Sequence, residues 1–440
     1  MGEAAVATRS QLGATAVELL QRLIRIDTTN PPGREREAQE MLRDELARAG
    51  FECVLVGREP ERPNLVARLG GEAVGPTLCL LGHSDTVPAD PSEWSRDPWC
   101  GDVADGEVWG RGALDMKSQV AANAVTIASL AREGFQPAGD LIFAATADEE
   151  VGEGTPYGLE WLCEAHPDAV RCDYAVNEGA GDRVEIGGRV LYLCSSAEKR
   201  SSPVVIHVHG RSGHGSMPNI ADNALVKAAP LIARLGEFSA EPRLLPETEG
   251  FLAAIGDRVP PAGEALSFAR AVDPVAAEMV EPLLGMTVSP TIIHASDKRN
   301  VIPGRCEITV DTRLLPGQTE EQAEQALREW LGPGDYDLEW RGGYGGTRSE
   351  LGTPLWSAIE RFVDELEPGA RLAPICVAGF TDSHWLREAF GTVAYGFFPL
   401  RTMSAEVAAR LIHSADERIP VEDVGLGVDF LRSVAQSVGS

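Results

Sequence analysis

The stretch from Leu78 to Gly152 decides the fold, because it joins strand-like runs to acidic and histidine-bearing ends. It contains LCLLGHSDTV (78–87), GRGALDMK (110–117) and ATADEEVG (145–152). The runs 78–81 and 141–145 are apolar and have the length of buried strands. Ligands of open α/β sheets gather beyond the carboxyl ends of the strands. We therefore expect His83, Asp115 and the pair Glu149-Glu150 to converge on one edge of a sheet.

The residue types in these three motifs suit a metal site. Imidazole and carboxylate are the usual zinc ligands where thiolate is absent, and an aspartate such as Asp115 can bridge two neighbouring ions. Adjacent residues at a strand end point to opposite sides, so one of Glu149 and Glu150 can bind metal while the other faces the substrate water. Asp85, on the same side of the extended segment as His83, is expected to fix the ring of that histidine.

Composition limits the class of protein. A chain of 440 residues favours two domains. Its formal net charge of −28 argues against nucleic acid and anionic membranes as partners. No apolar run approaches the length of a membrane span, and no signal-peptide pattern opens the chain, so we expect a cytoplasmic protein. The 8 cysteines lack CxxC spacing and are expected to be reduced.

The order of segments predicts a discontinuous first domain. Strand-like and helix-like segments alternate up to Asn177, which favours a mixed or parallel sheet covered on both faces. A self-contained two-layer α/β unit is expected over residues 201–344, with the glycine-rich stretch 342–346 as the return linker. Residues 1–200 and 345–440 would then form the first domain. Within the inserted unit, Glu237–Gly285 is expected to be irregular and rich in proline. Near the C-terminus, Ala405–His413 is expected to be helical.

Together, the three motifs resemble the signature of a family of dizinc peptidases and amidohydrolases. This family includes aminoacylase, carboxypeptidase G, carboxypeptidase S and succinyl-diaminopimelate desuccinylase. The resemblance implies an α/β fold: a zinc-peptidase-like catalytic domain with a mixed central sheet, plus an inserted, smaller two-layer α/β lid and dimerisation domain. It implies two Zn²⁺ ions, for which Co²⁺ can substitute, and a cis peptide bond between Asp115 and Met116.

Two further metal ligands follow from the resemblance. Glu178, in NEG (177–179), and His413, in LIHSADE (411–417), match the family's remaining ligand positions. The implied sets are His83, Asp115 and Glu178 for one ion, and Asp115, Glu150 and His413 for the other. Glu149 is then the general base that activates the bridging water. The family usually has Gly-Pro where this chain has Phe398-Pro399, and we expect Phe398 to narrow the pocket wall.

The resemblance also implies residues that recognise the substrate. His214, in GHGSMP (213–218), matches a lid histidine that stabilises the tetrahedral oxyanion. Asn300 and Arg313 match residues that bind a substrate carboxylate, for which an arginine fork is well suited. Thr381 and Asp382 lie in a motif that resembles a substrate loop, with Phe380 in place of a glycine. Of the remaining histidines, His384 is at most a pocket residue, and we expect packed or surface positions for His166, His207, His209 and His294.

The expected reaction is metal-assisted hydrolysis of an amide bond whose product carries a free carboxylate. N-acyl amino acid amidohydrolase and carboxypeptidase are the leading activities, and dipeptidase or succinyl-diaminopimelate desuccinylase-like deacylase is the alternative. A non-catalytic binding protein on the same fold is a remote third. The family dimerises through the lid, so we expect a homodimer in which His214 reaches the neighbour's site. Strand Val204–Val208 is the expected exposed edge, unless Glu237–Gly285 covers it.

Overall fold

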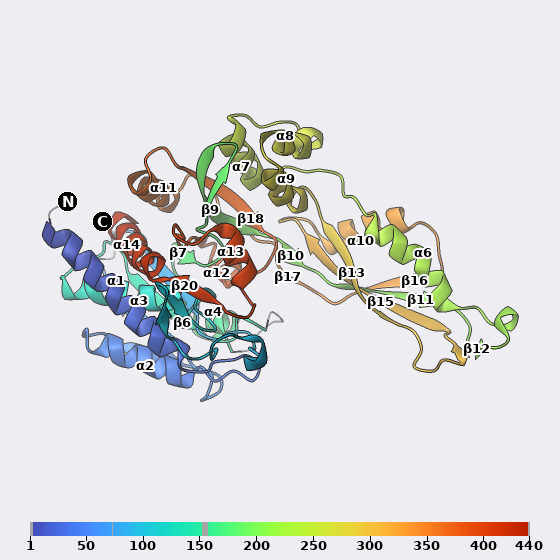
Figure 1. The fold of residues 1–440 in the computed structure, drawn as a ribbon, viewed down its shortest axis with the longest axis horizontal. Coiled ribbons are helices and arrows are strands. Elements are labelled where there is room, and N and C mark those ends of the chain that lie inside the picture. Colours follow the sequence, from blue (N-terminus) through green and yellow to red (C-terminus); the bar gives the residue numbers. More distant parts are fainter. Residues whose placement is uncertain (1–2, 73, 152–156, 439–440) are drawn as a thin grey trace. The chain divides into compact units, whose positions relative to one another are not determined.

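The computed structural model describes residues 3–72, 74–151 and 157–438, in two compact units (Figure 1). The first unit comprises Met1–Ser196, Ser349–Ile375 and Thr381–Ser440. The second comprises Ala197–Arg348 and Cys376–Phe380. Along the described parts of the chain, no helix has both the length and the hydrophobicity needed to cross a membrane.

The first unit is built on a mixed sheet. Its strand order is β1-β2-β6-β3-β7-β19-β9-β18, and β8 also pairs with β9. Strand β3 runs parallel to both β6 and β7, and β19 runs parallel to β7, whereas β1, β2 and β6 are joined by antiparallel pairing. The strands are β1 (Cys53–Val56), β2 (Asn64–Leu69), β3 (Leu78–His83), β6 (Leu141–Thr146), β7 (Tyr174–Asn177), β8 (Arg183–Ile186), β9 (Arg189–Glu198), β18 (Arg371–Val377) and β19 (Val393–Gly396).

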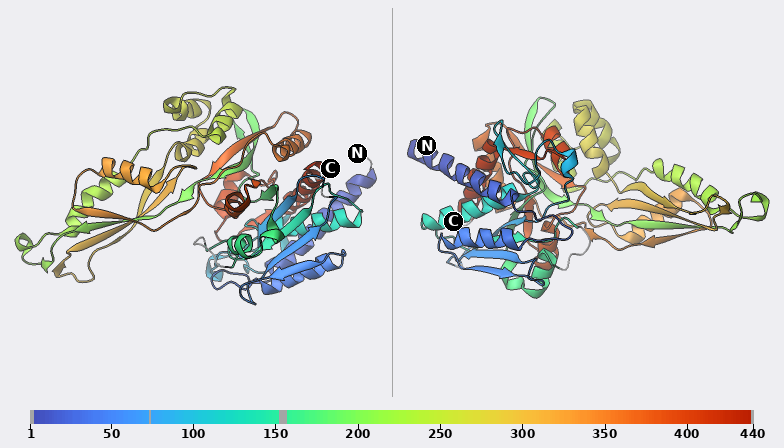
Figure 2. Two further views of the ribbon diagram at one scale, coloured as in Figure 1. Left: turned by 180° about the vertical axis from the view of Figure 1, so that it is seen from behind. Right: turned by 60° about the horizontal axis from the view of Figure 1, so that its bottom comes forward.

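Helices cover both faces of this sheet because its central strands are apolar on both sides. Alternate side chains of a strand point to opposite faces. Leu80 and Phe143 accordingly join one buried cluster, and Leu81 and Ile142 join another. Figures 1 and 2 show α1 (blue) and α14 (dark red) side by side, and both helices contribute side chains to the first cluster. The covering helices are α1 (Glu3–Ile24), α2 (Arg36–Ala47), α3 (Lys117–Arg132), α11 (Pro354–Leu366) and α14 (Val421–Val438) on one face, and α4 (Leu159–Ala165) and α12 (Ser383–Phe390) on the other.

Parallel pairing brings the carboxyl ends of three strands together. His83, the last residue of β3, is in register with Thr146, the last residue of β6. Strand β7 ends nearby at Asn177, and α3 begins directly after Met116. The buried Lys117 ties the start of α3 to the end of α1, because its Nζ donates to the carbonyl oxygens of Leu23 (3.0 Å) and Ile26 (2.8 Å). The segments that carry His83, Glu149 and Glu178 therefore leave the sheet at the same edge.

The second unit is a sheet covered by helices. The strand order is β16-β11-β15-β10-β17, and β13 also pairs with β15. Helices α6 (Ala224–Gly236) and α10 (Glu320–Leu331) contribute to its apolar core. The strands are β10 (Arg200–Ser201), β11 (Val204–His209), β13 (Thr287–His294), β15 (Arg305–Leu314), β16 (Tyr336–Trp340) and β17 (Tyr344–Gly345).

Three local predictions are wrong. Strand β11 lies between β15 and β16, so Val204–Val208 is not an edge. The segment Glu237–Gly285 is not irregular, because it contains α7 (Pro246–Gly256), α8 (Ala265–Val272) and α9 (Pro274–Val280). Proline occupies the first turn of α7 and α9, where its missing N–H costs nothing. Helix α13 (Ala405–Leu411) ends before His413, whose φ is +60°.

Candidate metal centre

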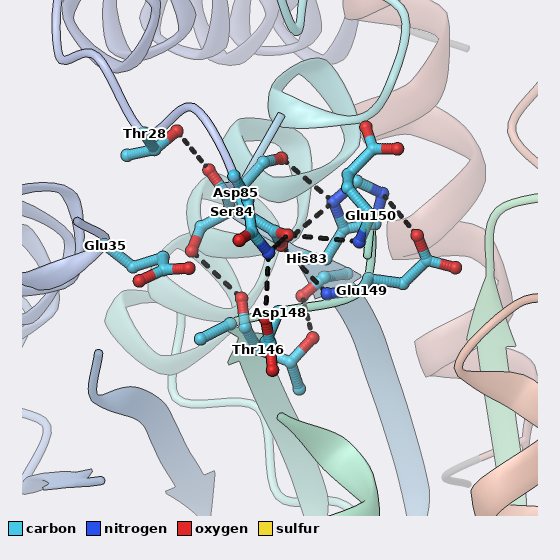
Figure 3. A network of polar contacts seen from close by, with 12 residues as sticks. Thr28, Glu35, His83, Ser84, Asp85, Thr146, Asp148, Glu149 and Glu150 are labelled. Carbon is cyan, nitrogen blue, oxygen red and sulfur yellow. Dashed lines mark hydrogen bonds and ion pairs between the residues drawn. The ribbon is translucent and has the colours of Figure 1, made fainter. Parts of the chain in front are cut away.

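The predicted ligands of the first unit meet at the carboxyl edge of its sheet. His83 ends β3, Asp115 precedes α3, the pair Glu149-Glu150 follows β6, Glu178 follows β7, and His413 follows α13. The peptide bond between Asp115 and Met116 is cis, as predicted. Figure 3 shows His83 with the neighbouring carboxylates of Glu149 and Glu150.

Asp115 presents one carboxylate oxygen to each of two histidines. Its Oδ1 lies 3.1 Å from His83 Nε2, and its Oδ2 lies 3.0 Å from His413 Nε2. Glu178 Oε1 lies 3.5 Å from His83 Nε2, and Glu150 Oε2 lies 3.1 Å from His413 Nε2. The structure therefore brings together all the residues that the resemblance implies as ligands, with Asp115 between the two halves.

This group of side chains fits divalent cations. Four carboxylates face two imidazoles, so the cluster has excess negative charge that burial makes costly unless cations compensate it. Glu150 Oε1 is buried and has no hydrogen-bond partner within the described residues. Ligand atoms of His83, Glu149 and Glu178 lie within 4.8 Å of one another, as do those of His83, Asp115 and Glu150. Nitrogen and carboxylate oxygen are donors that divalent metals such as zinc accept.

The pKa values of three of these side chains are raised by burial or by their charged neighbours. Burial raises the pKa of Glu178 to about 8. Hydrogen bonds to Asp115 and Glu150 raise the pKa of His413 to about 10. Burial, followed by the charge of Glu178, raises the pKa of Glu149 well above its usual range. These shifts reflect crowded, buried negative charge, which a bound cation would compensate.

Glu149 lies beside the predicted ligands. Its Oε2 is 3.9 Å from His83 Nε2, and its side chain is 10% exposed. The carboxylate of Glu149 therefore lies next to the predicted ligands and is partly open to a water or a substrate. A buried carboxylate with a raised pKa beside the predicted ligands is suited to accept a proton.

Asp85 contacts the ring of His83, and its backbone oxygen lies closer to the ring than its carboxylate does. The ring nitrogen Nδ1 of His83 lies 3.1 Å from the backbone oxygen of Asp85, but 3.6 Å from the carboxylate oxygen Oδ1. The carboxylate instead accepts the backbone N–H groups of Glu149 (3.2 Å) and Glu150 (3.1 Å). The backbone of Asp85 thus orients the ring, and its side chain holds the turn that carries the two glutamates.

Glu417 is a site residue whose role the sequence did not show. Its fully buried carboxylate accepts hydrogen bonds from Arg111 Nη1 (2.6 Å) and from the backbone N–H groups of Gly112 (3.0 Å), Leu114 (2.7 Å) and Asp115 (3.0 Å). It therefore links the loop of His413 to the loop of Asp115. The only signal was its position four residues after His413 in the motif.

Replacing Glu417 with glutamine should weaken metal binding by roughly 10–100-fold, as is typical of residues that orient ligands. A glutamine amide keeps the shape, but its NH₂ group cannot accept the N–H groups of the Asp115 loop, and Arg111 loses its counter-charge. Competition with a chromophoric chelator measures the affinity. The exposed Glu422, replaced in the same way, is the control. Unchanged affinity in a folded Glu417→Gln protein would contradict the linking role.

The second unit places two of the predicted substrate residues together. His214 is in register with Val301, and the backbone N–H of Gly215 donates to the carbonyl oxygen of Asn300 (2.8 Å). Arg313 is already engaged, because its Nε and Nη2 form a bidentate ion pair with Asp311 at 2.8 and 3.0 Å. Its fork is therefore not free in this structure.

The segment around Thr381 and Asp382 is buried. The Oγ1 of Thr381 accepts the backbone N–H of Ser383 (3.2 Å), and Asp382 Oδ2 accepts the hydroxyl of Thr146 (2.7 Å). Burial raises the pKa of Asp382 to about 7. Phe380, in place of a glycine, packs its ring edge-on against Tyr344 with the ring centroids 4.7 Å apart.

The remaining aromatic and histidine positions are structural. The Phe398 ring is buried against Gly427 of α14, so the expectation that it narrows the pocket wall is wrong. Among the histidines, His207 pairs with Glu339 (2.6 Å), His209 with Asp337 (2.8 Å) and the buried His384 with Glu388 (2.8 Å), while His166 packs on Trp161 and His294 is exposed.

Known proteins are similar to this chain in sequence and in fold. A succinyl-diaminopimelate desuccinylase of Phenylobacterium zucineum is 30% identical over 418 residues, covering 93% of this chain and 94% of the relative. An M20 family metallo-carboxypeptidase from Sulfolobus solfataricus superposes with a TM-score of 0.72 at 18% identity, covering 96% of this chain and 99% of that one. A dinuclear metal-binding peptidase of Bacillus subtilis gives a TM-score of 0.61 at 13% identity, with 97% and 98% covered.

The family model described as peptidase family M20/M25/M40 matches residues 79–437, which include every predicted metal ligand. With this match and the arrangement of His83, Asp115, Glu150, Glu178 and His413 at one sheet edge, the chain belongs to the M20/M25/M40 peptidase family of metal-dependent hydrolases.

Proposed function

We propose that this protein is a dizinc hydrolase that cleaves the amide bond of an N-acyl amino acid or short peptide and releases a product with a free carboxylate. The observation that carries the proposal is the position of Asp115, with one oxygen toward His83 and the other toward His413. Histidine nitrogen and carboxylate oxygen without cysteine favour zinc, and cobalt is a suitable substitute. Two zinc ions at this site would polarise the scissile carbonyl and make a water acidic enough to attack it.

Glu149 is the proposed general base and acid. Its carboxylate accepts the proton of the attacking water and returns it to the leaving nitrogen. Burial and the neighbouring Glu178 support this role, because both raise the pKa of Glu149 and so make its carboxylate a stronger proton acceptor. Asp85 would hold the base in place through the N–H of Glu149.

His214 is the proposed donor to the oxyanion of the tetrahedral intermediate. Its Nδ1 accepts the backbone N–H of Ser216 (3.2 Å), so the proton of a neutral ring resides on Nε2. That nitrogen is then a hydrogen-bond donor. His214 is exposed in the second unit, which leaves it accessible to a substrate.

Asn300 and Arg313 are the proposed carboxylate-binding residues, and Thr381 and Asp382 the proposed substrate loop. Asn300 is exposed next to His214, which supports its place at the substrate. To bind Arg313, a substrate carboxylate must contact Nη1 or displace Asp311 from Nε and Nη2.

A desuccinylase is the second candidate. The relative of Phenylobacterium zucineum bears that name and aligns with nearly the whole chain, whereas the solved structures support the fold alone. A panel of N-acetyl and N-succinyl amino acids, N-succinyl-diaminopimelate and dipeptides, offered to the zinc-loaded enzyme, separates the candidates. Turnover of acyl amino acids supports the proposal, and turnover of N-succinyl-diaminopimelate alone supports the second candidate. No hydrolysis by fully loaded protein would favour a binding protein.

We also propose that the second unit forms a homodimer through β13 and α6. Within the described residues, β13 pairs with β15 alone, and its Ile292 and Ile293 are 62% and 47% exposed. Val226 on α6 is exposed as well, and α6 packs near β13. An exposed apolar edge strand favours pairing with a symmetry mate. The net charge of −28 supports small molecules rather than nucleic acid or anionic membranes as further partners.

If His214 acts on the neighbour's substrate, two inactive variants should complement each other. A mixture of Glu149→Gln and His214→Ala dimers would contain mixed dimers with one complete site, giving about one quarter of wild-type activity after random exchange. Steady-state hydrolysis measures this. The same pair carrying Ile292→Asp, which charges the proposed interface, is the control and should stay inactive. A single-chain mass for the unaltered enzyme in solution would contradict the proposal.

A further inference from the structure

A buried amide joins the N-terminal segment to the metal cluster. Asn30 precedes the first strand of the sheet and is 2% exposed. Its Nδ2 donates to Asp85 Oδ2 (2.8 Å) and to Asp148 Oδ1 (2.9 Å). Both N–H groups of one side chain thus hold two carboxylates: Asp148 directly precedes the glutamate pair, and Asp85 accepts the backbone N–H groups of both glutamates.

A buried guanidinium completes this network. Arg62 donates to both oxygens of Glu35 (2.8 and 3.2 Å) and lies 2.8 Å from Asp148 Oδ1. The ring of Tyr157 lies 4.7 Å from its Cζ. On another side, Gly33 leaves no room, because a Cβ there would be 2.2 Å from Cζ. Arg62 is therefore fixed in one place.

The network acts on the turn that carries Glu149 and Glu150. Asp85 accepts the N–H groups of both glutamates, and Asp148 is the residue directly before them. Asp148 has a φ of +66°, which a residue with a side chain adopts when its surroundings impose it. Asn30 and Arg62 both hold Asp148, and Asn30 also holds Asp85. The direction of the glutamate carboxylates therefore depends on these two side chains.

Charge makes Arg62 hard to replace. Glu35, Asp85 and Asp148 are buried carboxylates connected by this network, and Arg62 is the cation that contacts two of them. Without it, the carboxylates would repel one another or take up protons, and either change would release the turn. Hydrogen-bonded networks of this kind are sensitive to the loss of one member.

We propose that Asn30 and Arg62 are positioning residues that aim Glu149 at the reacting water and Glu150 at the metal. They touch neither substrate nor metal and act through Asp85 and Asp148. The effect on turnover rests on the proposed function, whereas the effect on metal binding does not.

The test compares Asn30→Leu, Arg62→Met and Arg62→Lys with the unaltered enzyme. Leucine has a similar size without the amide donors, and lysine keeps the charge that pairs with Asp148. The control is Arg183→Met, which removes a bidentate ion pair with Glu367 (2.7 and 2.8 Å) elsewhere in the same unit. Chelator competition measures metal affinity, the visible spectrum of the Co²⁺-loaded protein reports ligand geometry, and steady-state kinetics separate kcat from KM.

We expect Asn30→Leu and Arg62→Met to lower both metal affinity and kcat by roughly 10–100-fold. KM should change little, because the substrate contacts remain. The cobalt spectrum should shift, Arg62→Lys should recover part of the loss, and Arg183→Met should match the unaltered enzyme. If Asn30→Leu fails to fold, the difference in metal affinity and cobalt spectrum between Arg62→Lys and Arg62→Met tests the proposal by itself.

Folded Asn30→Leu and Arg62→Met proteins with an unchanged cobalt spectrum and unchanged metal affinity would overturn the proposal. An equal loss in Arg183→Met would overturn it too, since the effect would then be general destabilisation. If the unaltered enzyme hydrolyses nothing in the substrate panel, the proposed function fails, but affinity and spectrum still decide whether Asn30 and Arg62 position the turn.

Discussion

Replacing Glu149 with glutamine is expected to lower kcat by roughly 10²–10⁴-fold while the metal ions stay bound. Glutamine has the same shape as glutamate, and its backbone N–H can still donate to Asp85. Its amide cannot accept a proton from the attacking water, so the loss should be in the chemical step. Turnover of the zinc-loaded variant, with metal content measured on the same sample, tests this.

The exposed Glu52 is a suitable control, because Glu52→Gln removes the same charge outside the metal cluster. This control should retain full activity. A near-normal kcat in a fully zinc-loaded Glu149→Gln enzyme would show that Glu149 is not the proton acceptor. Loss of metal from the variant would instead identify Glu149 as a ligand, which its 3.9 Å distance from His83 Nε2 makes a fair competing outcome.

Replacing Asp115 with asparagine should release both metals and lower activity by at least about 10³-fold, because several kcal/mol of transition-state stabilisation depend on them. One oxygen of Asp115 faces His83 and the other faces His413. Asparagine keeps a single oxygen and presents an NH₂ group to the second ion, so it cannot bridge. Elemental analysis after dialysis measures the metal content, and circular dichroism measures the fold.

Asp90→Asn is the matched control, because Asp90 is an exposed helix-capping residue and asparagine also caps. Chelation of the unaltered enzyme should reproduce the loss, and added zinc or cobalt should reverse it. Full metal content in a folded Asp115→Asn protein would refute the bridging role, and activity that survives exhaustive chelation would refute the metal mechanism.

Much of the site could be predicted from short motifs, for a physical reason. His83 and the glutamate pair each follow an apolar strand, and parallel strands bring their carboxyl ends to one edge. This local rule places the residues without knowledge of the rest of the chain. Glu178 and His413 were predicted from the resemblance, since their own surroundings in the sequence are typical of surface loops.

Other features depended on contacts that sequence patterns do not encode. The order of strands in the second unit is one of them: the apolar pattern of β11 suits a central and an edge strand equally well, and the edge prediction was wrong. Prolines in Glu237–Gly285 suggested irregular chain, but two of them, Pro246 and Pro274, begin helices α7 and α9. Arg313 was expected to bind a substrate carboxylate with its guanidinium, yet two of its nitrogens already bind Asp311.

The sequence by itself determined the α/β class, the family and the ligand types, because periodicity and motif spacing are local properties of the chain. Only the tertiary structure decided how the ligands are held. Glu417 reaches the Asp115 loop from 302 positions away, and Asn30 reaches Asp148 across 118. Charged and amide residues are usually exposed, so a sequence gives no sign that these are buried and bonded to one another. Their role follows from packing that brings distant segments together around buried charge.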